Sequence, residues 1–141
     1  MMLNRIYVGE EVDWRLRNLK ARTGLRPNLL CHLGFCLSLA EPGIPDPWLY
    51  ADGKAREFDC YALTEQWNLL LSLLRQRLIR DGLDPEVDLE MHFKAHLSRG
   101  VFLLYQRLKR LEDLTMLVTE AQQYASNHPG LRQRNVLRDG G

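Results

Sequence analysis

The segment PNLLCHLGFCLSL, residues 27–39, constrains the fold more than any other part of the sequence. Pro27 suits the first turn of a helix. A helix whose apolar side chains cover nearly its whole circumference must be buried on every side. It therefore lies either in a monomeric core or between subunits of an oligomer. We expect Leu29, Leu33, Phe35 and Leu37 there. The apolar side chains that cover nearly its whole circumference are Leu29, Leu30, Cys31, Leu33, Phe35, Cys36, Leu37 and Leu39.

An amphipathic helix precedes this segment. Glu10 and Glu11 fall in its first turn, where the helix dipole favours acidic side chains, and Gly24 ends it. Before it, residues 4–8 (NRIYV) alternate and predict one short strand or extended arm, which would need a partner strand. The apolar stripe of the helix follows the spacing i, i+4, i+7, i+11 at Val12, Leu16, Leu19 and Thr23.

The middle of the chain is rich in turn-forming residues. Residues 41–60 carry three prolines and two glycines, which predicts a long irregular connection within one domain. Residues 61–81 then predict a helix, which Gly82 ends. The side chains expected to face inward from this helix are Leu63, Trp67, Leu70, Leu71, Leu74 and Leu78.

Residues 87–97 (VDLEMHFKAHL) fit two kinds of secondary structure. Their strict alternation suits a strand, but Asp84-Pro85-Glu86 is a good helix start, and Leu89, Phe93 and Leu97 also fit a helical period. We predict a helix. Residues 101–126 predict one long helix with apolar contacts on two sides, and residues 127–141 a basic tail. The whole pattern indicates a mainly α single domain over residues 1–141.

Charge is distributed unevenly along the chain. The formal net charge of +1 is too small to indicate a nucleic-acid binder by itself. However, residues 1–40 sum to +3, residues 41–90 to −6 and residues 91–141 to +4. The first residues do not resemble a signal peptide, and no apolar run approaches the about 20 residues of a membrane span, so we expect a cytoplasmic protein. Three cysteines, an odd number, indicate reduced thiols.

A basic corner lies between the first two helices. The start of the second helix offers unpaired N–H groups and a partial positive charge, and Arg22 and Arg26 flank the turn that leads into it. On the first helix, Arg15 and Arg22 share one flank of the apolar stripe, while Lys20 and Arg17 take the other. This arrangement is typical of a phosphate contact, although a solvated basic helix face has a similar sequence.

Several blocks resemble the DndE family of the bacterial DNA phosphorothioation system. They are LKARTGL (19–25), RPNLLCHLGFCLSL (26–39), EPGIP (41–45) and HLSRG (96–100), so the resemblance covers most of the chain. It implies a small, mostly helical DNA-binding protein that forms a tetramer, with a ribbon-helix-helix-like front over residues 4–40 and a helical C-terminal half. It also implies a preference for nicked double-stranded DNA and partners that deliver and insert sulfur. No cofactor and no catalytic residue are implied.

The resemblance also implies which residues contact the DNA backbone. Lys20, Arg22 and Gly24 match the family's Leu-Lys-x-Arg-Thr-Gly-Leu block. A ribbon-helix-helix front would place Arg5 and Tyr7 on a paired ribbon that can enter the major groove. A preference for nicks needs backbone contacts instead, so Arg5 is a secondary candidate. The full set of DNA-binding candidates is Lys20, Arg22, Arg17, Arg15, Arg26 and Arg5.

Other chemistry receives little support from the sequence. Cys31 and Cys36 are five residues apart among Leu and Phe, which favours buried apolar side chains over metal ligands. His92 and His96, which we place on the polar side of their helix, could chelate a metal but lack a third ligand, so we expect no metal site. Two alternatives remain: a DNA-nicking nuclease that uses acidic residues between 81 and 90 with these histidines, and a protein–protein scaffold of the same system.

Overall fold

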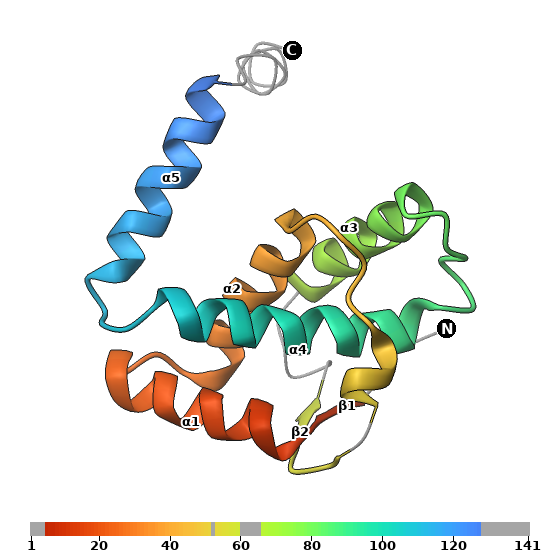
Figure 1. Cartoon of the computed structure of the whole chain (residues 1–141), viewed down its shortest axis with the longest axis horizontal. Helices are drawn as coiled ribbons and strands as arrows, with labels where there is room; N and C mark the ends of the chain where they lie inside the picture. The colour runs from red at the N-terminus through yellow and green to blue at the C-terminus, as the bar shows by residue number, and fades with distance from the viewer. Residues whose placement is uncertain (1–4, 52, 60–65, 128–141) are drawn as a thin grey trace.

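The computed structural model describes residues 5–51, 53–59 and 66–127 and confirms the mainly helical class. One long helix runs through the middle of the molecule, with the other elements arranged around it (Figure 1). In chain order the elements are strand β1 (Arg5–Val8), helices α1 (Glu10–Thr23) and α2 (Pro27–Ala40), the 3-10 helix η1 (Pro47–Tyr50), strand β2 (Arg56–Asp59), and helices α3 (Gln66–Arg80), α4 (Leu89–Arg107) and α5 (Asp113–Asn127).

The predicted strand at 4–8 finds its partner within the same chain. β1 pairs antiparallel with β2, with Ile6 opposite Phe58 and Val8 opposite Arg56. The prediction of an irregular connection over residues 41–60 was therefore wrong in part, since that segment holds both η1 and β2. Its prolines and glycines concealed a strand of only four residues. Ile6, Val8 and Phe58 are buried, so this small sheet covers one end of the core.

α2 and α4 cross in backbone contact at two glycines. A Cβ atom placed on Gly34 would lie 2.7 Å from the carbonyl carbon of Gly100, and one placed on Gly100 would lie 2.0 Å from the carbonyl oxygen of Gly34. Phe35 and Phe93 pack beside this crossing, with ring centroids 5.0 Å apart. Glycine at both positions is therefore what lets the two helices approach so closely.

The helical prediction for residues 87–97 is confirmed, but the predicted single helix over 101–126 was wrong. α4 continues to Arg107, the chain leaves the helix at residues 108–112, and α5 begins at Asp113. The side chain of Leu108 is fully buried, and the Asp113 carboxylate accepts the backbone N–H groups of Lys109 (2.8 Å) and Arg110 (2.9 Å). The burial of Leu108 and the Asp113 cap therefore interrupt the helix in a segment that contains neither glycine nor proline.

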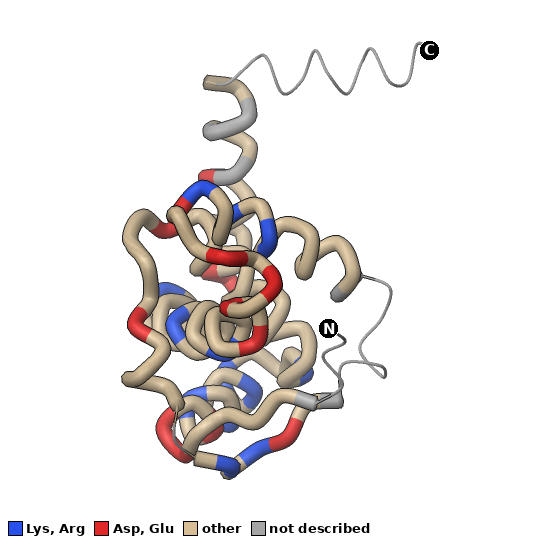
Figure 2. Tube along the Cα trace, turned by 90° about the vertical axis from the view of Figure 1, so that its right-hand side faces the viewer, with Lys and Arg blue, Asp and Glu red and all other residues tan. Residues whose placement is uncertain are grey.

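α5 projects from the body of the molecule (Figures 1 and 2). Leu111 and Val118 are about half exposed, and Leu114 and Leu117 are half-buried. Leu114 and Leu117 pack against the core, so only one of the two contact faces predicted for this region is covered in α5. The basic tail predicted at 127–141 lies outside the described residues after Asn127. Among the described residues, no helix is both long and apolar enough to cross a membrane.

α3 follows its prediction where the structure describes it. Leu70, Leu74 and Leu78 are buried, and Gly82 ends the helix region in a left-handed conformation (φ 78°). The first residues of the predicted helix, 61–65, lie outside the described residues, as does the side chain of Trp67.

α2 is not covered all round within one chain, so the prediction of complete burial was wrong for the monomer. Phe35 is fully buried, whereas Leu33 and Leu37 are half-buried and Leu29 is 45% exposed. Cys36, which we predicted to be buried, is also exposed. One face of the helix packs on α4, and the opposite face stays open.

A polar network closes the C-terminal end of α2. The buried guanidinium of Arg77 donates to the carbonyls of Leu39 (2.6 Å) and Gly43 (2.7 Å) and pairs with Asp81 (2.8 Å). Arg99 donates to the carbonyls of Ser38 (2.7 Å) and Gly43 (2.9 Å). These bonds satisfy carbonyls that a helix end leaves without partners.

The histidines of α4 face this network and not the solvent. His92 and His96 are 5% and 0% exposed, so their placement on the polar side of the helix was wrong. His96 Nδ1 lies 2.8 Å from the hydroxyl of Ser38, which itself accepts a bond from Arg99. Because polar and charged groups such as Ser38 and Arg99 pack against it, this helix face is buried although it is polar in sequence.

Candidate nucleic-acid interface

The block LKARTGL forms a tight corner between α1 and α2. Gly24 adopts a left-handed conformation (φ 74°), and its N–H donates to the carbonyl of Lys20 at 2.8 Å. The buried hydroxyl of Thr23 donates to the carbonyl of Leu19 (2.7 Å) and accepts from the N–H of Leu25 (3.1 Å). Gly24 therefore sets the turn, and Lys20 and Arg22 end up in the last turn of α1, exposed beside the start of α2.

The N-terminus of α2 faces this corner with no acidic neighbour in its first turn. Arg26 is exposed and occupies the N-cap position, where it makes no side-chain cap bond, and Pro27 follows. The early N–H groups of a helix lack intrahelical acceptors and carry a partial positive charge, so an anion is attracted here. In the described part of the chain, no carboxylate pairs with Lys20, Arg22 or Arg26.

The end of α4, which was not among the candidates from the sequence, completes this corner. Arg22 donates to the hydroxyl of Tyr105 at 2.9 Å, and its guanidinium lies 4.4 Å from the centre of the Tyr105 ring. The amino group of Lys109 lies 5.0 Å from the same ring and donates to the carbonyl of Tyr105 at 3.2 Å. We call Lys20, Arg22, Arg26, Tyr105 and Lys109 the basic corner. The i, i+4 pair Tyr105 and Lys109 was the only sequence signal for the α4 part.

The side chain of Arg15 packs against aromatic rings and does not extend freely into solvent. Its guanidinium lies 4.1 Å from the centre of the Phe102 ring, 5.4 Å from that of Tyr105 and 5.8 Å from that of Trp14. It also donates to the carbonyl of Glu11 at 3.2 Å. Its side chain packs α1 against α4 while its charge adds to the field of the basic corner.

The remaining candidates are arranged differently. Arg17 is exposed but pairs with Asp13 at 3.3 Å, and Asp13 also binds Arg56 at 2.5 Å. Part of the positive charge of Arg17 is therefore neutralised on the surface of α1. Arg5 opens β1, and its side chain lies outside the described residues.

Acidic residues gather near the start of α4, and basic residues gather near its end. The acidic residues of the α3–α4 connection gather where α4 begins, in the middle of the view in Figure 2. The basic corner lies where α4 ends, about 28 Å away at 1.5 Å per residue. Among the described residues, no three His, Cys, Asp or Glu side chains lie close enough to share a metal ion.

Replacing Tyr105 should show how strongly its ring holds the basic corner together. Tyr105→Phe removes one exposed hydrogen bond and should cost about 1 kcal/mol of unfolding free energy or less. Tyr105→Ala also removes the ring from three cations and should cost about 2–3 kcal/mol. Urea denaturation of both variants measures the difference. Equal losses in the two would mean that the ring contributes nothing beyond its hydroxyl.

Two comparisons found known proteins similar to this chain. The family model described as DNA sulphur modification protein DndE matches residues 5–112, from β1 to the turn before α5. The crystal structure of DndE from Escherichia coli B7A, described as involved in DNA phosphorothioation modification, has a similar fold with a TM-score of 0.58. The two sequences are 24% identical over 74% of this chain and 98% of that chain. A search of the curated proteins gave no match.

Proposed function

The chain belongs to the DndE family of DNA sulphur modification proteins, and from that premise we propose that it is a non-catalytic DNA-binding subunit of the phosphorothioation machinery. The observation that carries this proposal is the basic corner: Lys20 and Arg22 are exposed in the last turn of α1, Arg26 is exposed at the N-cap of α2, and Lys109 shares the Tyr105 ring with Arg22. Its ligand is the phosphate backbone of double-stranded DNA. A backbone phosphate there meets both positive charges and directed N–H donors.

One copy of the corner binds DNA weakly, because affinity and its salt dependence grow with the number of phosphates neutralised. The open face of α2 supports assembly of several copies. Leu29 on α2 and Leu69 and Leu73 on the neighbouring α3 are between 45% and 63% exposed, an apolar surface that a further subunit would cover. A tetramer, as the family resemblance implies, would gather four corners on one surface.

Backbone contact also supports a preference for nicked duplex. The cations lie at helix ends, and Arg15 and Arg17 on the length of α1 are occupied by aromatic rings and by Asp13, so α1 does not present a free row of base-reading side chains. A nick lets the duplex bend at lower cost, and bent DNA can touch more of a multi-copy basic surface.

The test is a fluorescence titration of intact and singly nicked duplex at two salt concentrations. Wild type should bind the nicked duplex more tightly and lose affinity steeply with salt. Lys20→Glu should bind at least about tenfold more weakly, because each copy then repels a phosphate it had attracted. Arg80→Glu, an exposed charge reversal on α3, is the matched control and should change the affinity little.

Light scattering on the same samples separates loss of contact from loss of assembly. A wild-type protein without salt-dependent affinity for either duplex would contradict the proposal. Magnesium-dependent conversion of supercoiled plasmid to open circles by the wild type would favour the nuclease alternative instead.

A further inference from the structure

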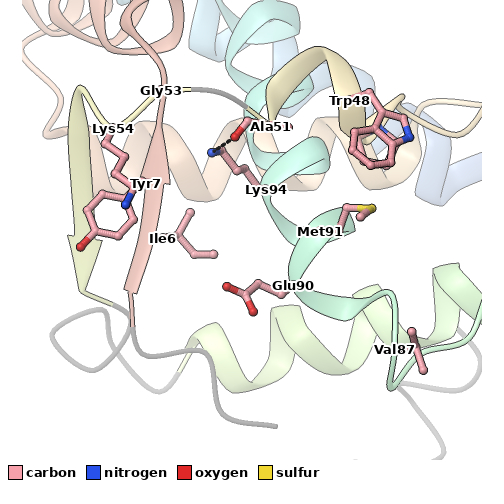
Figure 3. A pocket seen from close by; sticks show the side chains of 11 residues that line it. Ile6, Tyr7, Trp48, Ala51, Gly53, Lys54, Val87, Glu90, Met91 and Lys94 are labelled. Carbon is pink, nitrogen blue, oxygen red and sulfur yellow. Dashed lines mark hydrogen bonds between the residues drawn. The ribbon is translucent and has the colours of Figure 1, made fainter.

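A pocket lies near the start of α1, at the opposite end of this helix from the basic corner. It has a volume of about 610 Å³, within the about 300–1,000 Å³ typical of small-ligand pockets. It is lined by β1, η1, the first turns of α4, and Gly53 and Lys54 before β2 (Figure 3). The side chains that define its character are Tyr7, Trp48, Lys54, Glu90, Met91 and Lys94.

Trp48 points away from the core from a turn that a proline and a side-chain cap constrain. Its indole is 75% exposed, although tryptophan normally contributes to a core. Pro47 stands at the start of η1, and the Asp46 carboxylate accepts the N–H of Trp48 at 3.0 Å. This fixed turn presents a planar aromatic face at one side of the pocket, next to the half-exposed Met91 (Figure 3).

The other side of the pocket carries charge. The ammonium group of Lys54 lies 5.3 Å from the centre of the Tyr7 ring, which holds it at the pocket edge. Lys94 lines the pocket and donates to the carbonyl of Ala51 at 3.1 Å. The Glu90 side chain points from α4 toward the side of the pocket that Ile6 lines (Figure 3). The pocket thus combines an aromatic face, two cations and one hydrogen-bond acceptor.

We propose that this pocket receives a short unpaired end of the bound DNA, with one base stacked on Trp48 and a backbone phosphate at Lys54. Aromatic faces beside cations are the combination by which proteins hold single-stranded nucleic acid, since every base has a π-face and every nucleotide a phosphate. Glu90 can accept a bond from an exocyclic amino group. An apolar protein segment would cover Trp48 and Met91 but would offer no matching groups to Lys54 and Glu90.

The inference rests on the proposed DNA binding and adds a second contact to it. Gly53, beside Lys54, packs on Gly9 at the start of α1, because a Cβ atom on Gly53 would lie 2.7 Å from the Gly9 Cα. α1 therefore separates the pocket from the basic corner by about 20 Å. That length corresponds to about six base pairs of duplex. A base freed at a nick or a frayed end could reach the pocket while the paired part contacts the corner.

The experiment uses 2-aminopurine, whose fluorescence is quenched on stacking, in two DNA probes. One is a four-nucleotide single strand, and the other is a nicked duplex with one unpaired 2-aminopurine nucleotide at the nick. Full-length wild type should quench both probes. Trp48→Ala should bind both about tenfold more weakly, as loss of one stacking contact of about 1–3 kcal/mol predicts.

Leu49→Ala is the matched control, because Leu49 is on the same 3-10 helix and equally exposed (73%) but does not line this pocket. It should behave as wild type. Trp48→Ala should still bind a fully paired nicked duplex as wild type does, which separates this contact from the basic corner.

Two results would distinguish the two proposals. If wild type quenches the single strand, Trp48→Ala does not, and neither protein binds duplex, the pocket assignment holds and the proposed duplex binding fails. If wild type quenches neither probe, or Trp48→Ala quenches both equally well, the pocket assignment is overturned and the exposed Trp48 is left to a protein partner.

Discussion

Gly100→Ala should cost about 3 kcal/mol of unfolding free energy or more, although alanine favours a helix over glycine by about 1 kcal/mol. The added Cβ atom would lie 2.0 Å from the carbonyl oxygen of Gly34 and 2.8 Å from the backbone nitrogen of Phe35. Both are backbone atoms, so no side chain can rotate away. α2 and α4 would have to separate, and the packing of Phe35 against Phe93 would loosen with them.

Urea denaturation at one fixed protein concentration measures this effect, because assembly would make stability depend on concentration. Gln106→Ala, on an exposed face of the same helix, is the control and should change stability little. Gly34→Ala should be destabilising for the same reason, and the double variant should lose less than the sum of the two, since the helices separate only once. A Gly100→Ala protein as stable as wild type would contradict the close crossing.

Local periodicity was sufficient for the helices whose packing follows their own pattern. Val12, Leu16, Leu19 and Thr23 are all buried, as the stripe of α1 predicted. Turn residues were equally informative, because Gly24 and Gly82 have left-handed conformations that other residues rarely adopt. Both signals act within a few residues of chain, where a sequence can be interpreted without its tertiary contacts.

The elements that the sequence did not reveal depend on distant residues. The break after α4 arises because Leu108 enters the core and Asp113 caps the turn, and neither effect leaves a glycine or proline in the sequence. Tyr105 meets Arg22 across 83 residues of chain. Tyr105 and Lys109, the part of the basic corner at the end of α4, therefore could not be predicted, whereas the part formed by α1 and α2 was indicated by the LKARTGLRP block.

The buried polar core makes a second large effect predictable, on acid stability. The Ser38 hydroxyl accepts the Arg99 bond and has its own hydrogen available for Nδ1 of His96, which a neutral imidazole can accept. Burial, reinforced by the nearby charges of Arg99 and Arg77, lowers the pKa of His96 to about 3, although Asp81 acts in the opposite direction. Protonation of this ring would place a third positive charge among two guanidinium groups.

Lowering the pH from 7 to 4 should therefore destabilise the wild type by about 3 kcal/mol through His96 alone, at about 1.36 kcal/mol for each pKa unit. In an unfolded chain the pKa of a histidine is about 6.5. Between pH 6.5 and 3, His96 thus binds a proton in the unfolded state but not in the native state. The free energy of unfolding therefore falls as the pH falls through that range. Above pH 7 this contribution should be constant.

His96→Asn isolates this contribution, because its side-chain oxygen can accept the Ser38 bond at the position of Nδ1 but cannot titrate. Burial also lowers the pKa of His92 and His32, so acidification lowers the free energy of unfolding through these groups in both proteins. The difference between the two stability curves from pH 7 to pH 4 thus belongs to His96. The variant should start less stable and lose less on acidification; parallel curves would mean that the native core accepts the proton, and that Arg77 and Arg99 move away from the ring to allow it.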